Sequence, residues 1–93
     1  MRIPPSTLTK VVVTNKARLE VYSAIRSGRL PSLSAGNIPC TDCGSAAQVY
    51  EHRDYRRSLD VEPVCRPCNA RRGEGEPFRS NPKWRPDDEI SSP

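Results

Sequence analysis

The sequence predicts a small α+β fold that needs a stabilising centre beyond its own apolar core. The chain has 93 residues, 34% of them hydrophobic and 10 of them prolines, and such short chains seldom bury enough apolar surface to fold unaided. A helical pattern comes first, and two short strand-like segments then lie between two C-x-x-C pairs. One domain of mixed secondary structure is therefore expected, held together at its cysteines.

The N-terminal region, residues 1–39, is expected to hold an arm, a basic helix and a linker. The arm contains Val11–Val13, a β-branched run that favours a short strand or an extended lead-in. A helix is predicted over residues 16–27, with Thr14 or Asn15 as its N-cap. Glycine and proline beyond this helix end it and make the following linker irregular.

The predicted helix has an apolar face and a basic face. Leu19, Tyr22 and Ile25 recur at helical spacing, so this stripe is expected to pack against the rest of the chain. A groove-reading helix is the alternative, and the two roles are compatible because one face packs while the other stays basic. The cations predicted to contact nucleic acid from this helix are Lys16, Arg18 and Arg26.

The four cysteines form two C-x-x-C pairs, Cys40 with Cys43 and Cys65 with Cys68, and 21 residues separate the pairs. Zinc takes four thiolates in a tetrahedral site, and pairs with this spacing are typical of such sites. Two residues between ligands allow a tight turn to aim both sulfurs at one ion, and Gly44 suits that turn. The cysteines are therefore predicted to bind a structural zinc ion.

Two disulfides are the alternative use of the four cysteines. Disulfides require an oxidising compartment, and no apolar signal-like segment opens the sequence. No stretch approaches the roughly twenty apolar residues of a membrane span. Cytoplasmic placement without a membrane is therefore expected, with reduced thiols available to a metal.

The metal module is predicted to span residues 40–73. Ala46–His52 has strand propensity, and Leu59–Val61 alternates as a partner strand would. Pro67 suits the first turn of a helix that begins at the second cysteine pair. A ligand-bearing turn, a hairpin and a ligand-bearing helix together make a four-cysteine treble clef.

Charge is unevenly distributed along the chain. The formal net charge of +4 divides into +5 for residues 1–36, +1 for residues 37–73 and −2 for residues 74–93. A basic front end is compatible with binding to DNA or RNA. The cations predicted to contact phosphates from the metal module are Arg66, Arg71 and Arg72. Their alternative role is to offset the negative charge of four thiolates around one zinc ion.

Residues 74–93 are expected to form a flexible acidic tail. Proline recurs in this segment, and three consecutive carboxylates lie at Asp87–Glu89. Phe78 and Trp84 are the exceptions, because isolated aromatic side chains in a tail often dock on a surface. These two residues are predicted to contact a protein partner.

Two stretches resemble the core of the HNH, or His-Me finger, nucleases: residues 49–55 (VYEHRDY) and residues 64–73 (VCRPCNARRG). The variant that they resemble most is the phage endonuclease VII type, which carries a zinc-bound treble clef. This resemblance implies that Glu51 and Asn69 bind one Mg²⁺ ion. It also implies that His52 serves as the general base, or orients it.

The chain departs from that family at two positions. Asp54 stands where the endonuclease VII pattern has a second histidine, and Asp60 stands where many HNH sequences have asparagine. Three functions therefore stay open. The first is a phage-type zinc protein of HNH-like ancestry that binds nucleic acid, and the second is a Mg²⁺-dependent DNA endonuclease using His52. The third is a zinc module that docks on a larger protein machine.

Overall fold

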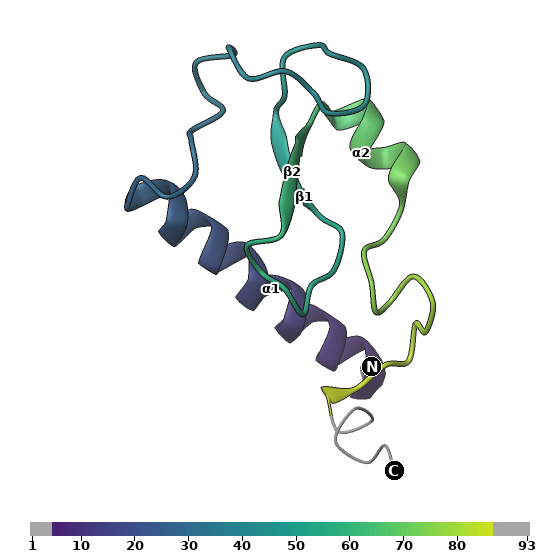
Figure 1. Ribbon diagram of the computed structural model, residues 1–93. Helices are drawn as coiled ribbons and strands as arrows, with labels where there is room; N and C mark the ends of the chain where they lie inside the picture. The colour runs from purple at the N-terminus through teal and green to yellow at the C-terminus, as the bar shows by residue number, and fades with distance from the viewer. Residues whose placement is uncertain (1–4, 87–93) are drawn as a thin grey trace.

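A computed structural model describes residues 5–86 of the chain, and it has the small α+β architecture that the sequence predicts. In chain order the elements are α1 (Pro5–Arg26), β1 (Val49–His52), β2 (Val61–Val64) and α2 (Arg66–Arg72). The two strands pair in an antiparallel sheet. Figure 1 shows α1 running along one side of the molecule, with the hairpin and α2 on the other side of it.

Helix α1 is longer at its N-terminus than the sequence predicts. It begins at Pro5 and includes Val11–Val13, so the predicted strand or extended lead-in is wrong. Proline is tolerated in a first helical turn because its missing N–H would have no partner there. Thr14 lies inside the helix and is not its cap, since its hydroxyl donates to the Lys10 carbonyl at 2.9 Å. Within residues 5–86 no helix is both long and apolar enough to cross a membrane.

The buried face of α1 also differs from the predicted one. Ala17, Val21 and Ala24 are 2%, 7% and 0% exposed. Leu19 and Tyr22, which were expected to pack, are 67% and 60% exposed. Small side chains on the buried face allow the helix backbone to approach the rest of the chain closely, which large side chains would prevent.

The hairpin lies where the sequence predicts it and holds the core of the cysteine region. Val49 pairs with Val64, and His52 pairs with Val61 at the other end of the ladder. The buried cluster beside it consists of Cys40, Val64, Cys65 and Cys68, with Val49 packed against them. Three of the four fully clustered residues are cysteines, so the core of this region is the candidate metal centre itself.

Residues 74–86 pack against the body, although the sequence predicts them as part of a flexible tail. The Tyr55 amide donates to the Glu76 carbonyl at 2.7 Å, and the Glu76 amide donates to the Arg53 carbonyl at 2.8 Å. Phe78 and Trp84 are 0% and 8% exposed, so their side chains are buried within this chain. Both side chains therefore expose little surface for the protein partner that the sequence predicts for them. The remainder of the predicted tail, residues 87–93, lies outside the described residues.

The C-terminal segment, residues 74–86, reaches the N-terminal half of α1 (Figure 1). Lys10 of α1 forms an ion pair with Glu74, and its ammonium lies 5.7 Å from the ring centroid of Phe78. Gly75 packs so closely on the end of β1 that a Cβ atom at this position would clash with the His52 carbonyl oxygen. The C-terminal segment is thus fitted to both α1 and the hairpin.

Candidate metal centre

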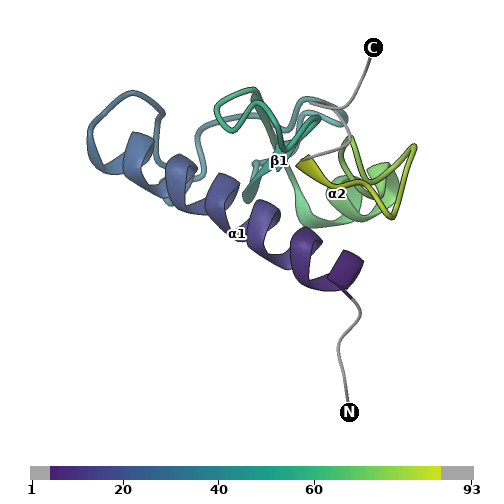
Figure 2. The same cartoon turned by 90° about the horizontal axis from the view of Figure 1, so that it is seen from below.

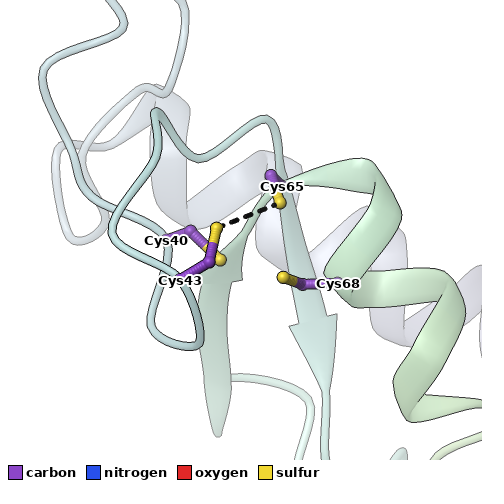
Figure 3. Close-up of side chains that lie close together, drawn as sticks. All are labelled: Cys40, Cys43, Cys65 and Cys68. Atoms are coloured by element: carbon purple, nitrogen blue, oxygen red, sulfur yellow. Dashed lines mark hydrogen bonds between the residues drawn. The ribbon is translucent and has the colours of Figure 1, made fainter.

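The four cysteine sulfurs converge on one point, as Figure 3 shows. All four lie within 4.8 Å of one another, and the Sγ atoms of Cys43 and Cys65 are 3.6 Å apart. Tetrahedral zinc with Zn–S bonds of about 2.3 Å places its sulfurs about 3.8 Å apart. All four cysteines are free, and a disulfide would need sulfurs about 2.0 Å apart. The donor set therefore fits a structural zinc ion and does not form the alternative disulfides.

The first cysteine pair is held by a tight turn before β1. The Cys40 amide donates to the Ser45 carbonyl, and the Gly44 amide donates back to the Cys40 carbonyl at 2.9 Å. Gly44 has φ of +81°, a left-handed conformation that favours glycine. The Asp42 amide lies 3.4 Å from the Cys40 sulfur and can donate to it. This turn directs both sulfurs to the same side.

The second cysteine pair is held by the first turn of α2. Cys65 is the N-cap residue of that helix, with extended backbone angles, and Pro67 follows in the first turn. The Asn69 amide donates to the Cys65 carbonyl at 2.9 Å, which fixes the turn between the two ligands. Cys68 is the buried residue of α2. Two local turns, each predictable from its spacing, therefore supply the four sulfurs.

Crowding of the sulfurs separates their acidities. Burial opposes ionisation of Cys40, but backbone hydrogen bonds from Cys65, Cys43 and Asp42 lower its pKa to about 6. Hydrogen bonding with Cys65, followed by burial, raises the pKa of Cys68 to about 12. The first thiolate thus forms readily and the last is opposed by negative charge already present. A divalent cation removes that opposition, so metal binding should release protons.

Arg72 connects the first cysteine turn to the sheet. Its Nε and Nη2 donate to the Asp42 carboxylate at 2.7 and 2.6 Å. Its Nη1 donates to Glu51 of β1 at 2.8 Å and to Glu62 of β2 at 2.9 Å. Hydrogen bonding to Arg72 holds the pKa of Asp42 below its usual value. The guanidinium therefore serves three carboxylates, and it is not free to meet a phosphate.

The residues of this ionic cluster were only partly identifiable from the sequence. Arg72 was assigned to phosphates and Glu51 to Mg²⁺, whereas the structure joins the two side chains to each other. Asp42 and Glu62 received no role. The one available signal was position, because Asp42 lies between two ligands and Arg72 lies one helical turn after Cys68.

The residues implied by the HNH resemblance meet at a second place. Glu51, His52 and Asn69 all line one surface depression of about 490 Å³, between α1, β1 and α2. His52 is 5% exposed, and its Nε2 lies 2.9 Å from the Ser58 carbonyl oxygen. Because a carbonyl only accepts, Nε2 carries the proton in this contact.

Burial lowers the pKa of His52, although the Ser58 carbonyl and the Glu51 charge oppose the shift. The ring is therefore neutral near pH 7 and stacks on Tyr55 with centroids 5.1 Å apart. Its surroundings are those of a packed side chain.

The two aspartates at which the chain departs from the HNH pattern, Asp54 and Asp60, do not line that depression. Asp54 accepts from the Arg56 amide at 2.9 Å and from its Nη2 at 2.7 Å, and this hydrogen bonding lowers the pKa of Asp54. Asp60 is exposed, and its amide donates to the Arg57 carbonyl. Asp54 thus organises the loop after β1 and does not replace the second histidine.

Five of the six cations predicted to contact nucleic acid remain exposed. They are Lys16, Arg18, Arg26, Arg66 and Arg71. In the part of the chain that the structure describes, none of these five forms an ion pair with a carboxylate, in contrast to Arg72. Arg71 also points a guanidinium nitrogen at the Cys68 sulfur, 3.9 Å away. The candidate metal centre is therefore bordered on α2 by two exposed guanidinium groups, and that of Arg71 also contacts a candidate metal ligand.

Comparison with protein-family models, with curated proteins and with solved structures finds no match to this chain. The likeness to HNH nucleases therefore rests on its motif residues alone. Identification of a function has to come from the chemistry of the site.

Proposed function

We propose that this chain is a zinc module of the treble-clef type that binds nucleic acid through its phosphates. A ligand-bearing turn, a hairpin and a helix whose first turn carries two ligands support the treble-clef assignment. Nucleic-acid binding is carried by one observation: Arg66 and Arg71 of α2 are exposed and unpaired with any described carboxylate, beside an Arg72 that is fully paired.

The binding chemistry follows from the guanidinium group. Arginine presents a planar fork of donors that matches two phosphate oxygens, and it stays charged at every physiological pH. Phosphate contacts position a protein without reading bases. Binding through Arg66 and Arg71 should therefore tolerate many sequences and weaken steeply with added salt.

Fluorescence anisotropy with labelled duplex DNA, single-stranded DNA and RNA over a salt series tests this proposal. The variant R66Q/R71Q should bind more weakly than the wild type and lower the log–log salt slope on duplex DNA by about 2, since each phosphate contact contributes about 0.9. A matched control is R79Q/K83Q, which removes the same charge from exposed positions of the C-terminal segment. Absence of binding to all three probes at low salt, or equal losses in both variants, would count against the proposal.

A Mg²⁺-dependent endonuclease is the second candidate, and the shared depression favours it. Glu51 and His52 end β1, Asn69 lies in α2, and all three line one surface hollow. Glu51 is already bound by Arg72, and His52 is bound at Nε2, so a nuclease would have to release or share both contacts. Because both side chains already have partners, the endonuclease is a weaker candidate than the nucleic-acid-binding module.

Plasmid nicking in Mg²⁺ or Mn²⁺ distinguishes the two candidates. An endonuclease should lose at least about 100-fold of its cleavage rate in H52N, the scale of a lost general base, while zinc content stays at one ion per chain. N69A should instead raise the Mg²⁺ concentration required. A wild-type protein that binds DNA but leaves it intact in both metals would eliminate the endonuclease.

A further inference from the structure

The outward face of α1 carries an apolar stripe that nothing in the described chain covers. Its exposed side chains, with their exposed fractions, are Leu8 at 53%, Val11 at 48%, Val12 at 61%, Leu19 at 67% and Tyr22 at 60%. The rest of the chain lies on the other side of the helix, as Figure 2 shows. On that inner side Ala17, Val21 and Ala24 are buried. α1 is thus apolar on two opposite faces and uses only one of them.

The stripe has the spacing of a coiled-coil seam. Its positions 8, 12, 15, 19 and 22 are separated alternately by four and three residues, which is the heptad repeat of a and d sites. At about 100° per residue they fall within about 80° of the helix circumference. Asn15 is the one polar member, and by this spacing it occupies a d site. We call these positions the outer seam of α1.

The charges beside the outer seam indicate its partner. Lys16 borders one side and Arg18 the other, and Arg26 continues the seam toward its C-terminal end. The acidic residue of α1, Glu20, is bonded to Ser58 of the hairpin loop. A second copy of this chain would therefore bring cations against cations, whereas a helix flanked by carboxylates would pair with them.

We infer that the outer seam of α1 binds an α-helix of another protein, one whose own apolar seam is flanked by Glu or Asp. The stripe from Leu8 to Tyr22 is about 21 Å long at 1.5 Å per residue, enough for four turns of a partner helix. The interaction uses a surface distinct from Arg66 and Arg71 of α2. It would place a nucleic-acid-binding zinc module on a larger assembly.

Three designed helical peptides test this inference with the zinc-loaded, full-length chain. The first has leucine at a and d with glutamate at e and g, the second replaces glutamate by lysine, and the third keeps glutamate but has serine at a and d. Titration calorimetry should detect binding of the first peptide and at least about tenfold weaker binding of the other two, since each lost hot-spot contact costs about 1.4 kcal/mol or more.

Surface variants of the protein locate the site. L19S/Y22S should lose binding of the first peptide at least about tenfold while keeping its zinc and its circular dichroism spectrum, because both side chains are exposed. L59S is the matched control, since Leu59 is 44% exposed but lies in the hairpin loop, and R66Q/R71Q should also bind the peptide normally. Equal binding of all three peptides, or no loss in L19S/Y22S, would overturn the inference.

Two other occupants of the seam are separate outcomes of the same experiments. Sedimentation equilibrium of the wild type that yields a dimer, dissolved by L19S/Y22S, would replace the inference by self-association. Flotation with vesicles of phosphatidylserine and phosphatidylcholine, lost in L19S/Y22S, would replace it by an anionic membrane surface. The inference is supported if the protein is a monomer that binds the first peptide but neither the vesicles nor the second peptide.

Discussion

Two regions of this chain are held together by different physical means. Around the candidate metal centre, Val49 and Val64 add only a small apolar cluster to the cysteines. Around the end of β1, four aromatic rings form a chain: His52 stacks on Tyr55, Tyr55 lies 6.0 Å from Phe78, and Phe78 meets Trp84 edge-on at 5.9 Å. The first region has few apolar contacts beside its candidate metal centre, and the second is held by apolar burial.

β1 belongs to both regions, and its last two residues divide between them. Glu51 joins the ionic cluster of Arg72, while its neighbour His52 joins the aromatic chain. Successive strand residues point to opposite faces, so one strand end can serve a metal module on one side and an aromatic core on the other. The four-cysteine cluster therefore organises only part of this chain. The remainder is fastened by α1 and by residues 74–86.

Removal of the metal should have the largest effect. Structural zinc contributes about 10–16 kcal/mol in comparable small sites, which is comparable to the entire stability of an ordinary small domain, about 5–15 kcal/mol. C65S, or a strong chelator, should therefore abolish the cooperative unfolding transition. Near-UV circular dichroism and a colorimetric zinc assay measure the two losses together. Persistence of the near-UV signal in zinc-free protein would mean that the aromatic region folds on its own.

The aromatic region should break without loss of zinc. Phe78 is fully buried, and removing a buried phenylalanine costs about 3–5 kcal/mol. F78A should lower the free energy of unfolding by that amount while zinc stoichiometry remains one per chain at saturating metal. R79A, which truncates the exposed neighbour, is the control. Release of zinc from folded F78A would show that the two regions are one cooperative unit.

Arg72 connects the first cysteine turn to both strands of the sheet, and its loss should have an intermediate effect. Its side chain is 11% exposed and its partner Glu51 is 8% exposed, but Asp42 is 36% exposed. Breaking a fully buried pair costs about 3–5 kcal/mol, so R72A should cost about 2–3 kcal/mol because two of its partners, Asp42 and Glu62, are partly solvated. Zinc affinity, measured by chelator competition, should fall about 10-fold or more because Asp42 lies between two ligands. R71A should change neither quantity by as much.

The same division explains what could be predicted from sequence. The metal centre was predictable because each cysteine pair lies in a local turn. Only the chain between the two pairs then had to fold so that the pairs meet. The helix around residues 16–27 was also found, since its period is visible. The β-branched run Val11–Val13 was misassigned because strand propensity is weak beside the length of a continuous helix.

The aromatic region was not predictable, because its contacts depend on distant segments. Proline-rich composition indicated a flexible tail, whereas Phe78 and Trp84 are buried against residues far away in the sequence. The buried face of α1 was missed for a related reason. Hydrophobicity ranks Leu19 and Tyr22 above Ala17 and Ala24, but the small side chains are the ones that the rest of the chain buries. The sequence thus shows that α1 has two faces able to pack, and only the structure shows which of them is buried within this chain.

His52 provides the smallest of these tests, because its ring belongs to the aromatic region and its unperturbed pKa is close to neutral. Burial lowers its pKa below the ordinary value of 6.5, so the folded chain binds fewer protons at this site than the unfolded chain. Its contribution to stability is then fully present above pH 6.5 and is lost as the pH falls from there through the folded pKa.

Urea unfolding at pH 7.5 and pH 6, with saturating zinc, should show wild type losing more stability on acidification than H52Q. The zinc thiolates are common to both proteins, so their acid sensitivity cancels in the difference. A difference that stays constant with pH, or that grows in favour of wild type at low pH, would show that the ring is solvated or protonated in the fold and does not belong to the aromatic region.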